Sequence, residues 1–205
     1  MAEFVEGWQF LSSYFKKVTV FGSARTSPSA KWYKEAAKFA NLLAKDGFDV
    51  ITGGGPGIME AANRGASNAK NENTNGKKPV GESIGLDIQL PMEQRRNKYV
   101  RKGRGFYYFF VRKVMLSYHS HGYIFFPGGF GTLDEVFELL TLVQTNKIER
   151  VPIILVGREF WNPLVDWIRT TVYGEFKHIS KEDQDIFSLV DTAEEAYAII
   201  KKSVA

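Results

Sequence analysis

The sequence predicts an α/β fold, a doubly wound, Rossmann-like parallel sheet with helices on both faces, in a single domain over residues 1–205. Three observations predict it. Apolar strand-like runs alternate with helical patterns along almost the whole chain, which is typical of stacked β-α units. Residues 151–156 are nearly all aliphatic, as in a strand covered on both faces. Three of the runs end in unusual loops, two of them rich in glycine, at the edge where such sheets bind ligands.

Composition and spacing justify the elements in order along the chain. Short apolar runs rich in β-branched and aromatic residues predict strands at residues 18–21, 48–52, 83–88, 123–126, 151–156 and, on the sheet edge, 186–190. Apolar residues at helical spacing predict helices at residues 31–45, after the glycines of 53–57, and at 106–118, 133–147, 161–173 and 192–203. The polar residues 71–79 are expected to form a surface excursion.

Residues 1–16 predict an N-terminal helix that docks on the domain. Its apolar side chains are interrupted by Glu3 and Glu6, and no long apolar run follows, so the pattern is not that of a signal peptide. No segment approaches the ~20 apolar residues that a membrane span requires. We therefore expect a cytoplasmic protein without a membrane partner.

The composition is that of a soluble globular domain. Of the 205 residues, 44% are hydrophobic and 24% are charged. A chain of this length can bury roughly 70% of the surface that it exposes when unfolded, so its core requires no metal or disulfide. The absence of cysteine excludes disulfides, thiolate nucleophiles and cysteine-ligated zinc. The net charge of +4 would suit anionic small molecules and nucleic acid alike.

The glycines that follow the strands suit a phosphate group. Glycine removes the Cβ atoms that would block a ligand, and the next helix adds its free amides and the positive end of its dipole. The loops match neither Walker A, because no Gly-Lys-Ser/Thr follows, nor G-x-G-x-x-G, because Glu60 lies three residues after Gly57. The alternative is that these glycines only form tight turns. The candidate phosphate-binding residues are Gly22, Ser23, Gly54, Gly55, Gly128, Gly129, Gly131 and Thr132.

The pattern Thr-x-x-Glu occurs twice, at residues 132–135 and 192–195. It is a capping box, in which the threonine side chain caps the amide three residues on and the glutamate reaches back. The second copy follows no glycine loop and needs no functional explanation. Glu135 differs, because a carboxylate at the mouth of a phosphate pocket would be repelled by the ligand unless it acted near the sugar.

Four segments together resemble the LOG family, the cytokinin riboside 5′-monophosphate phosphoribohydrolases and their bacterial nucleotide-nucleosidase relatives, which are often mislabelled as lysine decarboxylases. The segments are GGGPGIMEAANRGA (53–66), PMEQRRNKYV (91–100), FFVRKVML (109–116) and PGGFGTLDE (127–135). The resemblance implies a Rossmann-like fold, a homodimer, and hydrolysis of the N-glycosidic bond of a nucleoside 5′-monophosphate. The products would be the free base and ribose 5-phosphate, and neither a metal nor a cofactor is expected.

The resemblance also implies roles for individual residues. Arg112 matches the catalytic arginine, and Lys113, the lysine that follows it, joins the substrate-binding residues. Residues 128–132 match the phosphate-binding loop, and Glu135 matches the catalytic glutamate. The bacterial branch has a glutamate at the position of Glu93, which could contact the ribose or the base, or pair with a neighbouring arginine instead.

Two departures from the family pattern bear on the choice of substrate. Phe110 and Val111 precede the Arg-Lys pair where plant members commonly have His-Glu or His-Gln, and Asp134 replaces a glutamate. The sequence is therefore more similar to the bacterial branch, which leaves cytokinin specificity open. The expected substrates are AMP and N6-modified AMP, including cytokinin riboside monophosphate.

The proposed hydrolysis is chemically reasonable for these residues. Cleavage between a ribose and its base builds positive charge on the sugar, which a carboxylate such as Glu135 can stabilise while it orients the attacking water. A neighbouring arginine would hold the phosphate or the ribose hydroxyls and keep that carboxylate ionised. A pyridoxal-dependent decarboxylase would need a Schiff-base lysine, and no lysine stands out for that role.

Three further features each allow two explanations. The basic residues between 95 and 104, with Tyr99 among them, favour a solvated loop that attracts nucleotides over an RNA-binding surface. His119 and His121 are expected to be cations at a helix C-terminus rather than zinc ligands. The apolar helix over 106–118 is expected to form the dimer interface, with a place in the domain core as the alternative.

Two rival functions stay open on the sequence alone. The molybdenum-cofactor carriers resemble this fold and also use glycine loops, in their case for a phosphate-bearing pterin, so a carrier of a nucleotide or phosphorylated cofactor is the chief alternative. The presence of both Arg112 and Glu135 argues against a carrier. An RNA-binding protein would rest on the basic residues alone.

Overall fold

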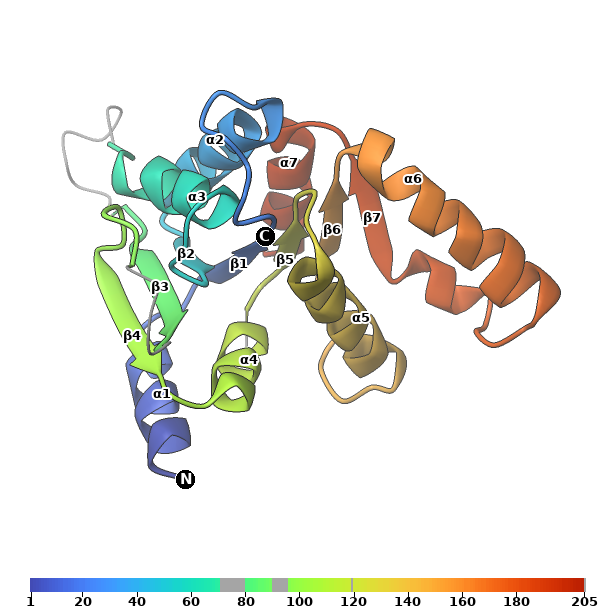
Figure 1. Ribbon diagram of the computed structural model, residues 1–205, viewed down its shortest axis with the longest axis horizontal. Helices are drawn as coiled ribbons and strands as arrows, with labels where there is room; N and C mark the ends of the chain where they lie inside the picture. The colour runs from blue at the N-terminus through green and yellow to red at the C-terminus, as the bar shows by residue number, and fades with distance from the viewer. Residues whose placement is uncertain (71–79, 90–95, 119, 205) are drawn as a thin grey trace.

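A computed structural model describes residues 1–70, 80–89, 96–118 and 120–204 (Figure 1). Within these residues, seven parallel strands form one sheet in the order β4-β3-β2-β1-β5-β6-β7. The strands are β1 Lys17–Phe21, β2 Asp49–Thr52, β3 Ser83–Ile88, β4 Lys102–Phe106, β5 Tyr123–Phe125, β6 Ile153–Val156 and β7 Phe187–Val190. The predicted Rossmann-like parallel sheet is confirmed.

Helices cover both faces of the sheet. They are α1 Ala2–Ser12, α2 Lys31–Lys45, α3 Ile58–Ser67, α4 Phe109–Ser117, α5 Phe130–Gln144, α6 Arg158–Trp167 and α7 Ala193–Ser203. A π-helix, Ile168–Glu175, continues α6, and a 3₁₀ turn, Glu182–Asp185, precedes β7. Figure 1 shows α2, α3 and α7 on one side of the sheet and α1, α4 and α5 on the other. None of the helices in the described part of the chain has the length and apolar character needed to span a bilayer.

Two hydrophobic cores result from the alternation of side chains along the strands. In β1, Val18 and Val20 belong to the core beneath α2, α3 and α7, whereas Phe21 belongs to the core on the other face. Phe21 stacks there on Phe125 of β5, with ring centroids 4.8 Å apart. Trp161 of α6 is completely buried in the same core. The central strands are apolar on both faces for this reason.

Strand β4 was missed by the sequence prediction, which assigned the basic residues to a loop. Its sequence, KGRGF, contains two glycines and two basic residues instead of an apolar run. The strand lies at the edge of the sheet and is mostly accessible to solvent, so burial does not select apolar residues there. Because β4 takes Phe106 into the sheet, α4 begins at Phe109 and not at residue 106 as predicted.

Two other helices differ from the prediction in their bounds. Helix α5 begins at Phe130, three residues before the predicted start. The amphipathic segment predicted at 161–173 begins earlier, as α6, and continues from Ile168 as a π-helix. The edge strand at 186–190 is confirmed as β7, and the buried aliphatic strand at 151–156 is confirmed as β6, the sixth strand in chain order instead of the fifth.

Candidate functional site

Three loops meet at the carboxyl end of the sheet, where the chain leaves β1 and β5 in opposite directions. The amide of Ser23, after β1, donates to the carbonyl of Pro127, after β5, at 3.0 Å. The carbonyl of Ser23 in turn accepts from the amide of Ile58, the first residue of α3, also at 3.0 Å. Gly57 has a φ of +68°, and a Cβ atom there would collide with the Ser23 carbonyl. The sequence therefore predicts correctly that these loops gather at the switch point of the sheet.

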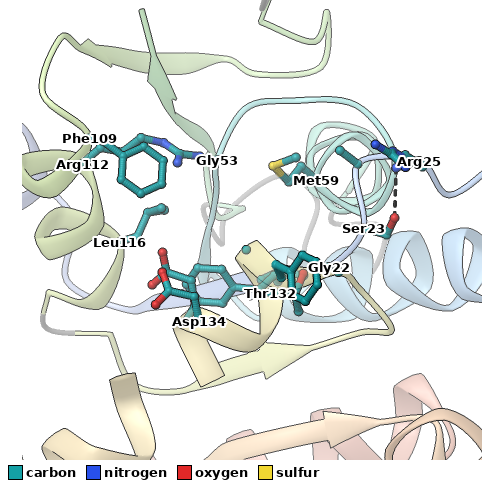
Figure 2. Close-up of a pocket in the computed structure, with 17 residues that line it drawn as sticks. Gly22, Ser23, Arg25, Gly53, Met59, Phe109, Arg112, Leu116, Thr132 and Asp134 are labelled. Atoms are coloured by element: carbon teal, nitrogen blue, oxygen red, sulfur yellow. Dashed lines mark hydrogen bonds between the residues drawn. The ribbon is translucent and has the colours of Figure 1, made fainter. Parts of the chain in front are cut away.

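A cavity of about 610 Å³ opens between these loops and α4 (Figure 2). Residues at its wall come from β1 and the loop after it, from the segment between β2 and α3, from α4, and from the first turns of α5. They include Gly22, Ser23, Arg25, Gly53, Met59, Phe109, Arg112, Leu116, Gly129, Phe130, Gly131, Thr132, Asp134 and Glu135. In Figure 2, Arg112 and Phe109 lie at one end of the cavity and Ser23 and Arg25 at the other, with Thr132 between them.

The N-terminus of α5 presents bare backbone to this cavity. Gly129 is the N-cap residue, no side chain caps the helix, and the first amides of a helix have no partner within it. A Cβ atom at Gly129 or Gly131 would meet nothing within 4 Å. Phe130, between them, is 92% exposed. This end of α5 can receive an anion on its amides, with the helix dipole favouring the same charge.

The capping box predicted at residues 132–135 is wrong. Because α5 begins at Phe130, Thr132 lies inside the first turn and is not the N-cap residue. Its side chain packs against Gly128, where a Cβ atom would collide with the threonine hydroxyl. The consecutive glycines before α5 allow the helix to begin earlier without a capping side chain, and Thr132 is left at the wall of the cavity.

Glu135 is a buried carboxyl group that lacks a full set of partners. It is 6% exposed, and its Oε2 atom has no hydrogen-bond partner among the described residues. Burial, with a contribution from Glu138, raises the pKa of Glu135 from 4.5 to about 8, although Lys113 and Arg112 act in the opposite direction. The expectation that arginine keeps this carboxylate ionised is therefore wrong, because desolvation outweighs the neighbouring cations.

Arg112 is positioned by contacts at its guanidinium. Nε donates to the carbonyl of Leu86 in β3 at 2.7 Å. The side chain lies against Gly53, where a Cβ atom would collide with the guanidinium, so this glycine is required by the close approach. Burial lowers the pKa of Arg112, and the charges of Glu135 and Asp87 raise it. The group stays cationic, since arginine does not lose its proton in proteins.

Lys113 lies between α4 and α5 and is not at the cavity wall. Its Nζ atom is 2.6 Å from Oδ2 of Asp134 and 3.5 Å from Oε2 of Glu138. The two predicted site residues of the Arg-Lys pair are thus separated, because consecutive residues of a helix point in different directions. Arg112 faces the cavity, and Lys113 joins the helix to α5.

The structure places Gly54 and Gly55 away from the cavity wall. The Asn97 side-chain amide donates to the carbonyls of Gly54, at 3.1 Å, and Gly55, at 2.9 Å, and the Gly54 amide donates to Thr52 Oγ1 at 2.9 Å. The neighbouring Gly53 lines the cavity instead. Glu93, also predicted as a site residue, lies outside the described residues.

Several wall residues were not predicted from the sequence. They are Arg25, Met59, Phe109, Leu116, Phe130 and Asp134, and their spacing in the sequence does not mark them as site residues. Arg25 could have been predicted most easily, since it follows Gly22 and Ser23 in the loop after β1. Its backbone amide donates to Ser23 Oγ at 3.0 Å. The apolar wall residues carry no signal that distinguishes them from core residues.

The described arginines between β3 and α4 are engaged within the chain. The Arg96 guanidinium donates to Asp87 at 2.7 Å, Arg104 pairs with Glu6, and Arg101 bonds to Ser67. Arg95 and His119 lie outside the described residues. The ring nitrogen Nδ1 of His121 accepts from the amide of Lys17 at 3.4 Å. No group of three or more His, Asp or Glu side chains within the described ranges is arranged to hold a metal ion.

The chain is similar to known proteins in sequence and in fold. A family model described as "Possible lysine decarboxylase" matches residues 59–200. The chain is 25% identical over 199 residues to the cytokinin riboside 5′-monophosphate phosphoribohydrolase LOG3 of Arabidopsis thaliana, covering 97% of this chain and 86% of the relative. It is 26% identical over 191 residues to LOG4 of the same plant, covering 93% and 82%.

Solved structures share the fold at lower identity. The molybdenum cofactor binding protein of Rippkaea orientalis superimposes with a TM-score of 0.64 at 21% identity, over 92% of this chain and 96% of that chain. The molybdenum cofactor carrier protein of Chlamydomonas reinhardtii superimposes with a TM-score of 0.63 at 19% identity, over 92% and 98%. At such identities the likeness concerns the fold alone.

Proposed function

The chain belongs to the LOG family, whose model matches residues 59–200, and from that premise we propose that it hydrolyses the N-glycosidic bond of nucleoside 5′-monophosphates. AMP and N6-modified AMP, including cytokinin riboside monophosphate, are the proposed substrates. One observation carries the proposal: Glu135 is buried, its Oε2 atom has no partner among the described residues, and it lies in the cavity wall together with Arg112 and the bare N-terminus of α5. A carboxyl group left in this state weakens the fold, so a role in the reaction accounts for it.

The phosphate would bind at the first turn of α5. The amides of residues 130–132 supply donors, and the Thr132 hydroxyl and the Ser23 loop lie in the same wall. Arg25, at the Ser23 end of the cavity, would add a positive charge. This arrangement requires a monoester phosphate next to the sugar, so a nucleoside without phosphate is a poor substrate.

Glu135 and Arg112 would act on the sugar. As the bond between C1′ and the base nitrogen breaks, positive charge develops on the ribose, and the carboxylate of Glu135 stabilises it. A water molecule then forms the new C1′–O bond and gives a proton to Glu135, which passes it on to the ring nitrogen of the departing base, so that the carboxylate is restored. Arg112 would hold the ribose hydroxyls or the phosphate through its free guanidinium nitrogens.

The description of the family model names a different reaction, a decarboxylation of lysine. Enzymes that decarboxylate amino acids with pyridoxal phosphate bind that cofactor through a lysine. No lysine is among the residues that line the described cavity, and Lys113 is paired with Asp134 and Glu138 instead. The residues present fit a nucleotide better than they fit a Schiff base.

A homodimer is part of the same proposal. Large apolar side chains of α1 and of the segment entering α4 are exposed to solvent, namely Val5, Trp8, Tyr107, Tyr108, Phe109, Phe110, Val114 and Tyr118. Among them, Trp8 of α1 contacts Tyr118 at the end of α4, with 6.1 Å between ring centroids. Exposed apolar patches of this kind mark protein interfaces. Sedimentation of the purified protein should give twice the 23.2 kDa mass of one chain.

The hydrolysis is tested by incubating the protein with AMP and separating the products by chromatography. Free adenine and ribose 5-phosphate in equal amounts are expected. Adenosine serves as the control, because it has the same glycosidic bond without the phosphate. If adenine is not released from AMP, or if it is released from adenosine at the same rate, the proposal fails. A carrier protein would return the nucleotide intact.

A further inference from the structure

Helix α4, which presents Arg112 to the cavity, has no side-chain cap of its own. Its N-cap residue is Tyr108, and no side chain of that residue accepts from the first turn. Val111 stands three residues later, where a glutamate would complete a capping box. A helix of nine residues with an unsatisfied start frays easily, which would move Arg112 in its second turn.

The missing partner comes from α1, about a hundred residues earlier in the chain. The two carboxylate oxygens of Glu3 accept from the amides of Tyr107, at 2.7 Å, and Tyr108, at 3.3 Å. The carboxylate also stands at the positive end of the α4 dipole. Glu3 thus does from a separate helix what the glutamate of a capping box does from within one.

Helix α1 is itself held firmly where it reaches α4. A Cβ atom at Gly7 would lie 2.7 Å from the sulfur of Met115, so the two helices are in close contact. At the other end of α1, the buried side chain of Lys17 donates to the carbonyl of Tyr14 at 2.8 Å and approaches that of Leu11 at 3.4 Å. Figure 1 shows α1 lying beside β4 and close to α4.

We propose that Glu3 is a positioning residue, which fixes the start of α4 and through it the guanidinium of Arg112. The line of contacts runs from Lys17 in β1 through α1 to Glu3, then through Tyr107 and Tyr108 to α4. It ends where Arg112 Nε donates to Leu86. Glu3 does not itself line the cavity. The proposed effect on turnover rests on the proposed function, whereas the capping itself does not.

Replacement of Glu3 by alanine tests the proposal, with Glu6→Ala as the matched control. Glu6 lies on the same helix, but it pairs with the Arg104 side chain of β4 and not with the amides before α4. Hydrogen exchange of the amides of residues 107–113 should become roughly tenfold faster in Glu3→Ala, as expected for a lost cap, and should stay unchanged in Glu6→Ala. Unchanged exchange in Glu3→Ala would overturn the capping, whether or not the protein hydrolyses nucleotides.

Turnover tests the second half of the proposal. For AMP, kcat/KM should fall about tenfold in Glu3→Ala and less in Glu3→Gln, which keeps one acceptor oxygen, while Glu6→Ala should change it by less than about twofold. In an Arg112→Lys background, Glu3→Ala should have almost no further effect, because it acts through the guanidinium. Effects that multiply in the double variant would overturn the positioning role.

Discussion

The starts of α5 and α7 share the pattern Thr-x-x-Glu and use it differently. In α7, Thr192 is the N-cap residue, and its hydroxyl accepts from the amide of Glu195 at 3.2 Å. The carboxylate of Glu195 reaches back to the amide of Asp191 at 2.8 Å, and both side chains are near solvent. In α5, the helix has already begun at Phe130 when the pattern occurs, so neither reciprocal bond forms.

The difference follows from what precedes each threonine. Before α5 stand glycines that end a buried strand and start a helix without a cap, and Glu135 is carried into the protein interior. Before Thr192 the chain runs from an edge strand into solvent, and the local bonds of the capping box determine the helix start. A carboxylate with its partners in place therefore stabilises α7, whereas a buried carboxyl group that lacks one in α5 costs stability.

Activity should separate the two glutamates most clearly. Glu135→Gln removes the carboxylate and keeps its shape, so base release from AMP should fall by roughly 10³-fold while AMP still binds. Glu195→Gln should leave turnover within about twofold of wild type. Chromatography of AMP incubations and calorimetric titration with AMP measure the two quantities. Unimpaired turnover in Glu135→Gln would refute the assignment of this carboxylate.

The dependence of kcat/KM on pH should show whether Glu135 acts in its ionised or its protonated form. With a pKa of about 8 in the free protein, the ionised form increases about tenfold per pH unit below that value. If the carboxylate acts as proposed, kcat/KM for AMP rises from pH 6 and levels off above pH 8, and Glu195→Gln shows the same profile. A kcat/KM that falls over this interval would mean that the protonated form is the active one.

Stability should show the cost of the buried carboxylate. Between pH 4.5 and 8 the folded chain keeps the proton of Glu135 and the unfolded chain releases it, so this group makes the protein less stable as pH rises through that window. Glu135→Gln should therefore match wild type near pH 4 and exceed its free energy of unfolding by at most about 5 kcal/mol well above pH 8. Urea unfolding at both pH values measures the difference. A variant that gains nothing at high pH would show that the site ionises freely.

Replacing the two threonines should have smaller effects than replacing the glutamates, and the two variants should differ in the free energy of unfolding. Thr192→Val removes an N-cap hydroxyl, which should lower the free energy of unfolding by about 1 kcal/mol and leave activity unchanged. Thr132→Val removes no cap and fills the same space against Gly128, so it should cost less than about 0.5 kcal/mol while raising KM for AMP several-fold. Equal losses of stability in the two variants would mean that Thr132 does cap α5.

Much of the fold could be predicted from particular residues. The aliphatic run of β6 and the amphipathic pattern of α2 identify their elements because the required burial leaves few alternatives. Strand β4 could not be predicted, since an exposed edge strand accepts glycine and basic residues, and pairing with β3 is a long-range event. The predicted start of α5 was three residues too late, because the pattern Thr-x-x-Glu predicts Thr132 as the N-cap residue. The helix instead begins at Phe130, with Gly129 as its N-cap.

The candidate site could be predicted in part. Its two central residues, Arg112 and Glu135, were identified through motifs and lie together at one cavity. The loop residues were only partly right, because Gly53 and not Gly54 or Gly55 faces the cavity, and the direction of one peptide in a glycine run cannot be read from composition. Which of Arg112 and Lys113 faces the cavity depends on how α4 is placed, and that placement is set by its packing against β3, β4 and α1.

By itself, the sequence determined that this chain forms a parallel α/β sheet, that loops meet at its carboxyl edge, and that a helix there begins among glycines, because these follow from local spacing and from side chains that are absent. Only the tertiary structure decided that Glu135 is buried with a raised pKa, whereas the side chain of Glu195, in the same pattern, is exposed to solvent. It also decided that Glu3 of α1 caps α4. Burial and partners across the chain are set by packing between distant segments, and no local pattern encodes them.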